Sequence, residues 1–514
     1  MENTAKSIRW WPLWVVIVLA VLGTLVTWIS DAGHRQDRIL LTTMIVIGTI
    51  ALSILWLLFL SEMRRRAKFI SLAAIILVIF LGTNVFEFKG FSGDLVPIFE
   101  WRWQESQSTF LLSSENVLDP HISPKDYPQF LGQNRDGIIS TTQLNLKWDM
   151  HPPQLVWRRP VGAGWSGFAI AGNSAITQEQ EGEQEKVVCY ELHTGNVKWS
   201  HQDFARYDVP PAGQGPRATP TISGNRVYTV GSTGILNCLD LETGEQLWTT
   251  NIFEEHEAET PPWGVSISPL VFDDLVVVSA GGAVAYHRET GEVVWIGHRI
   301  KSGYSSPFLT TFAGVKQIVI FNQGLVTAHE PLSGELLWKQ PWPTPSVECV
   351  SQPVPLPDDK LLVSSGYGVG AKLFQISRNP TGEFSVSTLW ETIYLKAKFT
   401  NIIYYEGYLY GLDDGIFACI NPADGIRQWK RGRYGHGQTL LISDVLLVLT
   451  ESGEVVLVDP NPDSHVEHAR FAPLKGRTWN TPALAGDYLL VRNDREAACY
   501  QLSTINTDIN SSIK

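Results

Sequence analysis

The chain has 514 residues, 44% of them hydrophobic and 18% charged, with a formal net charge of −12. That length accommodates one large domain and a smaller second part. Residues 1–90 hold nine Lys and Arg against five Asp and Glu, which leaves 31 against 47 in the remainder. So acidic a remainder lacks the clustered positive charge that nucleic-acid binding requires, and we expect no nucleic-acid partner.

Three apolar stretches come first, at about residues 10–29, 39–60 and 69–86. At about 1.5 Å per residue, each can cross a hydrocarbon layer about 30 Å thick. The first is too long for the apolar part of a signal peptide, and no small-x-small cleavage site follows it. We therefore expect residues 1–90 to form a membrane anchor with three transmembrane helices.

Basic residues indicate the orientation of this anchor. They gather before the first stretch and between the second and third, at Lys6, Arg9, Arg64, Arg65, Arg66 and Lys68. The loop between the first and second stretches holds only Arg35 and Arg38, beside Asp31 and Asp37. The positive-inside rule then predicts a multi-pass protein of the inner (cytoplasmic) membrane with a cytoplasmic N-terminus. Everything after the third span would be periplasmic or otherwise extracytoplasmic.

Residues 91–125 are expected to be a juxtamembrane linker, because the chain from Gln104 to Lys125 is polar and contains scattered Ser and Pro. Trp101 and Trp103, on either side of Arg102, suit the membrane interface.

A degenerate repeat organises the rest of the chain. Its clearest copy, LNCLDLETGEQLW, ends at Trp248, and related copies end at Trp199, Trp295, Trp338 and Trp429. A glycine precedes each tryptophan by four residues, at Gly195, Gly244, Gly291, Gly334 and Gly425. The first four tryptophans are 49, 47 and 43 residues apart. Such a period marks a unit that must stack on copies of itself to bury a core.

Each copy is expected to be a β-hairpin, with its glycine in the turn and the tryptophan on an outer strand. A second strand pair precedes it, and four short antiparallel strands per repeat make a propeller blade. The innermost strands are predicted to begin at Phe168, Pro220, Pro269, Pro307, Pro353, Ile402, Leu440 and Pro482. Because the last blade lacks an outer strand, Leu155–Val161 is expected to complete it and close the ring.

The predicted fold is therefore all-β, an eight-bladed propeller over residues 126–503 followed by a polar tail at 504–514. Blade five is irregular, since Gly382 lies eight residues before Trp390. Four cysteines, Cys189, Cys238, Cys419 and Cys499, share the repeat position that other blades give to alanine. Burial explains them better than a disulfide framework does.

The pattern A-x-D-x-x-T-G-x-x-x-W resembles the repeat of pyrroloquinoline quinone (PQQ) enzymes and of their non-enzymatic relatives, including the outer-membrane assembly lipoprotein propeller. YPQFLGQNRDG (Tyr127–Gly137), GPRATPTI, GYSSP, SSGYGVG, LKAKFT, YGLDDG and GRYGHGQ further resemble bacterial PQQ-binding-like propeller proteins of the planctomycete type. The resemblance covers residues 126–503. It implies a PQQ-like propeller, whereas activity must be argued from the site.

In a propeller, the loops from one outer strand to the next inner strand run across one face toward the axis. The candidate ligand-binding residues on these loops are Trp165, Arg217, Trp263, Tyr304, Lys398, His436, Arg477, Trp479 and Asn480. Flat rings beside cations suit a planar anionic ligand such as PQQ. In the alternative interpretation, the same side chains only fill the central channel.

Two functions are compatible with this sequence. The first is a membrane-tethered binding or assembly module for an envelope protein or a small anionic ligand. The second is a membrane quinoprotein dehydrogenase that uses PQQ and Ca²⁺ to oxidise alcohols or sugars. The chain has no Cys-Cys pair and no C-x-x-C-H haem site, and Glu348, Asp413 and Asp414 match no calcium-ligand pattern. These points favour the first function. The sequence assigns no particular residues to catalysis, and we predict no metal site.

Overall fold

The computed structural model describes residues 8–29, 34–102, 123–343 and 349–505. Trp103 and Glu348 lie outside these ranges. The chain divides into two units, residues 1–106 and 107–514.

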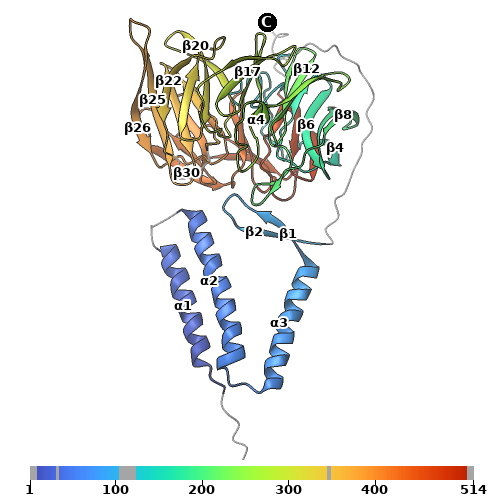
Figure 1. Ribbon diagram of the computed structural model, residues 1–514, viewed down its shortest axis with the longest axis vertical. Coiled ribbons are helices and arrows are strands. Elements are labelled where there is room, and N and C mark those ends of the chain that lie inside the picture. Colours follow the sequence, from blue (N-terminus) through green and yellow to red (C-terminus); the bar gives the residue numbers. More distant parts are fainter. Residues whose placement is uncertain (1–7, 30–33, 103–122, 344–348, 506–514) are drawn as a thin grey trace, which may run out of the picture. The chain divides into compact units, whose positions relative to one another are not determined.

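The first unit contains three long helices (Figure 1): α1 (Trp11–Ile29), α2 (Arg35–Leu55), which continues as a π-helical turn η1 (Trp56–Leu60), and α3 (Arg65–Val85). All three are long and apolar enough to cross a membrane, as the sequence predicts. Directly after α3, β1 (Phe86–Phe91) and β2 (Pro97–Trp101) form an antiparallel hairpin. Residues 91–125 were expected to be a linker, but β2 lies within this range and pairs with β1.

The described part of the second unit forms eight four-stranded blades, and one of them gains a fifth strand. The strands of blades 1 to 4 are β5 (Ala169–Ala171), β6 (Ser174–Glu181), β7 (Gln184–Glu191), β8 (Val197–Asp203); β11 (Thr221–Ser223), β12 (Arg226–Val230), β13 (Ile235–Asp240), β14 (Gln246–Asn251); β15 (Leu270–Phe272), β16 (Leu275–Ser279), β17 (Ala283–His287), β18 (Val293–Ile296); and β19 (Phe308–Phe312), β20 (Val315–Asn322), β21 (Leu325–His329), β22 (Leu336–Pro341). A short helix, α4 (Ile252–Glu255), follows β14.

Blades 5 to 8 continue the same order. Their strands are β23 (Val354–Leu356), β24 (Lys360–Ser365), β25 (Gly370–Arg378), β26 (Phe384–Thr392); β27 (Ile402–Tyr405), β28 (Tyr408–Asp413), β29 (Ile416–Ile420), β30 (Arg427–Arg433); β31 (Gln438–Ile442), β32 (Val445–Leu449), β33 (Val455–Val458), β34 (Glu467–Phe471); and β35 (Ala483–Ala485), β36 (Tyr488–Arg492), β37 (Glu496–Gln501) with β4 (Gln154–Pro160). Every predicted blade start lies within two residues of an observed one. The eight-bladed prediction is confirmed.

The ring closes as predicted, because β4 is the outer strand of blade 8. It pairs antiparallel with β37, and Trp157 lies opposite Cys499. The same small-residue-to-tryptophan pairing recurs in other blades, with Cys189 opposite Trp199 and Cys238 opposite Trp248. Cys189, Cys238, Cys419 and Cys499 are buried free thiols. The position therefore needs a small side chain, which cysteine and alanine both provide.

The repeat glycines explain how neighbouring blades dock. Gly244 has a φ of +72°, and a Cβ atom there would lie 2.4 Å from Cε3 of Trp199 in the preceding blade. The indole Nε1 of Trp199 donates to the carbonyl of Leu241 at 2.9 Å. Blade 5 lacks a glycine in this register, and Trp338 instead donates to Gln317 of its own blade at 2.6 Å. The repeat glycine and the tryptophan of the preceding blade thus form one inter-blade joint.

Residues 127–139 cross the propeller axis. Tyr127 pairs with Ile170 of blade 1, and the carbonyl of Pro128 accepts from the amide of Ile222 in blade 2 at 2.8 Å. The buried Arg135 donates to the carbonyls of Ser268 and Pro269, at the start of blade 3, at 2.9 and 2.8 Å. The segment ends as β3 (Ile138–Ile139), which adds in parallel to β31 of blade 7. The YPQFLGQNRDG motif therefore fills the axis.

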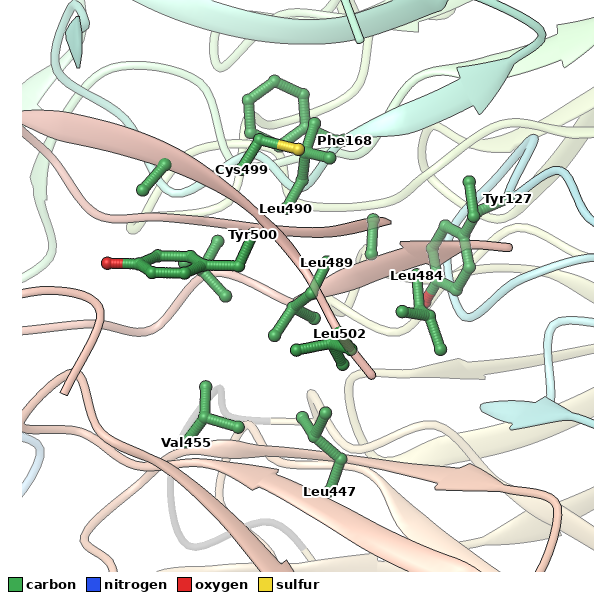
Figure 2. Close-up of a cluster of buried hydrophobic side chains, with 14 of the residues drawn as sticks. Tyr127, Phe168, Leu447, Val455, Leu484, Leu489, Leu490, Cys499, Tyr500 and Leu502 are labelled. Atoms are coloured by element: carbon green, nitrogen blue, oxygen red, sulfur yellow. The ribbon is translucent and has the colours of Figure 1, made fainter. Parts of the chain in front are cut away.

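The hydrophobic core is distributed between blades. Figure 2 shows the cluster that joins blades 7, 8 and 1, in which Leu447 and Val455 of blade 7 accompany Leu489, Leu490 and Cys499 of blade 8. Tyr127 and Phe168 complete it from the N-terminal side. Burial of this kind is worth about 25 cal/mol per Å² of apolar surface, so the closing blade is held by side chains as well as by its strand pairing.

Candidate binding face

The nine predicted residues all lie in connections from an outer strand to the next inner strand. Trp165 lies between β4 and β5, Arg217 between β8 and β11, Trp263 between β14 and β15, Tyr304 between β18 and β19, Lys398 between β26 and β27, His436 between β30 and β31, and Arg477, Trp479 and Asn480 between β34 and β35. These loops form the candidate binding face. Side-chain contacts sort its residues into two aromatic groups.

The first group surrounds Arg477. Its guanidinium lies 4.7 Å from the ring centre of Trp165 and 4.5 Å from that of Trp479. Phe399 extends the group, 5.2 Å from Trp479 and 5.3 Å from the buried ring of His436. Partial burial lowers the pKa of Arg477, but the residue remains a cation at neutral pH. Arg477 is therefore held by two indole faces of its own chain.

The second group surrounds Trp263. Its ring stacks on Tyr304 with centres 5.7 Å apart and lies 6.5 Å from Tyr367. Lys398, only 3% exposed, places its ammonium 5.2 Å from the Tyr367 ring. Lys398, like Arg477, thus rests against an aromatic ring of its own chain.

A small hairpin between blades 1 and 2 covers part of the first group. Its strands are β9 (Asp208–Val209) and β10 (Gly213–Gln214), and neither was predicted from the sequence. The Trp165 indole donates to the carbonyl of Ala212 at 2.9 Å. A Cβ atom on Gly213 would lie 3.2 Å from Trp165 and 3.4 Å from Arg477. The hairpin backbone therefore packs directly against this cation and its ring.

The same hairpin accepts hydrogen bonds from the Arg217 guanidinium. Arg217 donates to the carbonyls of Ala212 and Gly213 at 3.2 and 2.8 Å, and also to that of Gly215. Its guanidinium lies 4.6 Å from the ring centre of Tyr207. Burial lowers the pKa of Arg217 to about 10. Its donors face backbone carbonyls, so they are occupied without a ligand.

A ring of hydrogen bonds joins all eight blades at or just before the start of their inner strands, and Asn480 is one member. The Asn480 side chain donates to the Ser166 carbonyl at 2.8 Å, across the closing junction between blades 8 and 1. The other junctions are Ser166 Oγ to Ala218 O at 2.7 Å, Thr219 N to Ser268 Oγ at 3.0 Å, Ser268 N to Ser306 Oγ at 2.9 Å, Gln352 Nε2 to Ser306 O at 3.0 Å, Ser351 Oγ to Thr400 O at 2.9 Å, Thr439 N to Asn401 Oδ1 at 2.9 Å, and Gln438 Nε2 to Trp479 O at 3.2 Å. Asn480 thus has a clear structural role.

Two carboxylates on this face, Glu451 and Glu185, were not predicted from the sequence. Glu451 accepts from the Trp479 indole at 2.9 Å and from the His436 amide at 3.1 Å. Glu185 is 4% exposed and accepts from the Ser232 amide at 3.0 Å. Burial raises its pKa to about 7, while the bonds from Ser232 and the charge of Arg217 act in the opposite direction. Both residues lie in or beside turns between middle strands, where the sequence shows only hairpin chemistry.

PQQ and Ca²⁺ fit these residues poorly. Asp413, one of the three oxygen-bearing residues considered for calcium, is fully buried between the ammonium groups of Lys396 and Lys430, at 2.5 and 2.6 Å. Within the described ranges, no group of three or more His, Cys, Asp or Glu side chains could hold a metal ion. A tricarboxylate would also have to displace carbonyls from Arg217. We therefore derive no chemistry through this cofactor.

Comparison with known families decides the relationship. A family model described as outer membrane protein assembly factor BamB matches residues 183–431 and 323–507. The chain belongs to the BamB family. BamB of Burkholderia pseudomallei strain K96243 is 25% identical over 269 residues, which are 47% of this chain and 63% of that protein. The chain thus spans less than two thirds of this curated relative.

Solved structures share the fold. BamB from Moraxella catarrhalis has a TM-score of 0.50 and 16% identity, over 68% of this chain and 100% of its own. Two quinohemoprotein alcohol dehydrogenases also match at 12% identity. The enzyme from Comamonas testosteroni has a TM-score of 0.52 and covers 73% of this chain and 80% of its own, and that from Pseudomonas putida HK5 has 0.54, 75% and 81%. At such identities the match shows fold alone.

Proposed function

We propose that this protein is a membrane-anchored scaffold whose extracytoplasmic propeller binds another protein of the cell envelope. Membership of a family named for outer membrane protein assembly supports protein binding. The three apolar helices support anchoring, and the basic residues beside them favour the inner membrane with a cytoplasmic N-terminus.

One outer strand, β18 of blade 3, carries this proposal. Outer strands leave one backbone edge unpaired, and soluble proteins normally protect such edges with charged side chains. β18 reads VVWI and has neither a charged nor a polar side chain. Val293, Val294 and Ile296 are 37%, 47% and 46% exposed. The strand therefore presents an apolar, unprotected edge.

Most other outer strands of the ring are protected. β30 carries Arg427, Lys430, Arg431 and Arg433, and β34 carries Glu467, His468 and Arg470. β4 carries Arg158 and Arg159. The contrast is local to blade 3, although the neighbouring blades add exposed Leu247 and Leu332. An edge of this kind suits a partner that contributes an extended strand, because main-chain pairing supplies affinity and the apolar side chains supply contact area.

Site-specific crosslinking tests the proposal in living cells. A photo-crosslinking amino acid placed at Val294 should capture one defined envelope protein, identified by mass spectrometry. The same group at Arg470, on the protected outer strand of blade 7 and similarly exposed, is the matched control. Val294→Lys should abolish co-purification of the captured protein from detergent extracts while the propeller still folds. Equal capture from both positions, or co-purification unaffected by Val294→Lys, would reject blade 3 as the binding edge.

A further inference from the structure

The β1–β2 hairpin is continuous with the last apolar helix. α3 ends at Val85 and β1 begins at Phe86, so no spacer separates them. The amide of Arg102, directly after β2, donates to the carbonyl of Val85 at 3.1 Å. Both ends of the hairpin are therefore fixed to the end of α3 (Figure 1).

One face of this hairpin is aromatic. Phe86 pairs across the strands with Trp101, and Phe88 pairs with Phe99. Their ring centres are 4.7 and 5.6 Å apart. The four side chains are 39% to 59% exposed. Because side chains alternate along a strand, all four lie on the same face, and this aromatic face is unfavourable in water.

The opposite face is charged. Glu87 pairs across the strands with Glu100, and Lys89 binds Glu87 at 2.7 Å. Transfer of charged groups such as Glu87, Lys89 and Glu100 out of water is costly, so this face favours an aqueous environment. The hairpin is thus amphipathic, with an aromatic face on one side and a charged face on the other.

The turn of the hairpin reaches another helix end. Asp94 in the turn forms an ion pair with Arg35 at 2.9 Å, and Arg35 is the first residue of α2. Successive spans run in opposite directions, so the start of α2 and the end of α3 belong to the same side of a bilayer. A strand of six residues is about 20 Å long. With its base at α3 and its turn at α2, the hairpin lies along the membrane surface.

We propose that the β1–β2 hairpin is a lipid-binding element that inserts Phe86, Phe88, Phe99 and Trp101 into the headgroup region of the outer leaflet. Aromatic rings favour that depth. The free backbone edges of a two-stranded hairpin need water, which excludes deeper insertion into the hydrocarbon core. The charged face then points away from the lipid. This inference rests on the proposal that the three helices span the membrane.

Spin labels on the full chain in vesicles of phosphatidylcholine and phosphatidylglycerol test this arrangement. Phe99→Cys and Glu100→Cys are adjacent positions on opposite faces, and Ile79→Cys on the exposed side of α3 reports the span itself. Phe88→Cys and Glu87→Cys repeat the comparison with Phe99 intact. The five native thiols, Cys189, Cys238, Cys349, Cys419 and Cys499, are buried and should label little. The measured quantity is the ratio of collision rates with oxygen, which enters lipid, and with a water-soluble nickel chelate.

The label at position 99 should give a several-fold higher oxygen-to-nickel ratio than the label at 100, and its ratio should approach that at 79. Equal, water-like ratios at 99 and 100, with a lipid-like ratio at 79, would overturn the hairpin proposal and leave the membrane anchor intact. Low collision rates with both reagents at 99 would also overturn it, since the aromatic face would then be covered by protein. A water-like ratio at 79 would overturn the anchor and the hairpin proposal together.

Discussion

Gly244 lies against the indole of Trp199 in the preceding blade so closely that the turn has no space for a side chain. Gly195, Gly291, Gly334 and Gly425 have the same relationship to Trp157, Trp248, Trp295 and Trp390. The repeat motif therefore encodes a contact between blades, and the propeller depends on the motif for its assembly as well as for its local turns.

Replacing Gly244 by alanine should destabilise the propeller by about 2–5 kcal/mol, because positive φ costs a side chain about 1–2 kcal/mol and overpacking costs about 1–3 kcal/mol. The control is Gly182→Ala, where φ is +60° but a Cβ atom would meet nothing within 4 Å. Gly182→Ala should lose only the part of the stability that the positive φ costs, about 1–2 kcal/mol. Thermal unfolding of both variants in detergent, followed by tryptophan fluorescence, measures the difference, and equal losses would contradict the steric part of this prediction.

Glu185 should make stability depend on pH in the neutral range. Its pKa is about 7 in the folded protein and about 4.3 in an unfolded chain. The folded state thus holds this proton more tightly, and the stability contribution present below about pH 4.3 is lost as pH rises through about 7. The melting temperature of Glu185→Gln should therefore rise relative to that of the wild type as the pH increases from 5 to 8. If the difference in melting temperature between the two proteins stays constant over this pH range, Glu185 does not titrate there. The exposed Glu245→Gln serves as the control.

PQQ with Ca²⁺ should leave the melting temperature of the protein unchanged, because Asp413 is neutralised by Lys396 and Lys430 and Arg217 is bonded to carbonyls. Absorbance of bound cofactor and reduction of a dye with alcohols or sugars provide independent readouts. Stabilisation that disappears in Arg217→Ala or Lys398→Ala would instead support the dehydrogenase hypothesis.

Asp413→Asn should destabilise the protein by about 3–5 kcal/mol, since it leaves two lysines without their buried partner. Asp414 lies 3.5 Å from Lys396 and its side chain is 22% exposed, so Asp414→Asn is the matched control and should cost about 1 kcal/mol or less. Denaturant titration in detergent gives both values. A similar loss in the two variants would mean that burial of Asp413 does not decide the effect.

Topology can be measured with a membrane-impermeant maleimide on cells whose outer layer is permeabilised. Glu245→Cys, in the repeat turn of blade 2, should react in these cells before lysis. Met63→Cys, in the loop between η1 and α3, should react only after lysis. The opposite pattern would invert the orientation inferred from the basic residues.

Blade number, blade starts and ring closure could be predicted because each depends on local patterns that recur along the chain. The blade 5 irregularity was also visible, and Trp390 still contacts Gly425 of the next blade despite it. The resemblance to the planctomycete type stays an expectation.

The missed features depend on contacts distant in sequence. The Pro- and Gly-rich residues 208–214 have loop composition, and nothing local indicates that they cover Trp165 and Arg477. Residues 127–139 look like an ordinary surface loop, although Arg135 reaches blade 3. Loop positions of the nine candidate residues were predictable, but the partners of Arg217 and Asn480 were not, because sequence shows which groups can donate and not which carbonyls lie in reach.

Closure by β4 has a consequence for biosynthesis. This strand leaves the ribosome before any complete blade, whereas its partner β37 is among the last segments made. Domains generally fold from the N-terminus as they are synthesised, but here the earliest strand must wait for the latest. Until then the indole of Trp157 and the edge of the unfinished blade stay solvent-exposed, so a truncated or stalled chain would be marked for chaperones and proteases.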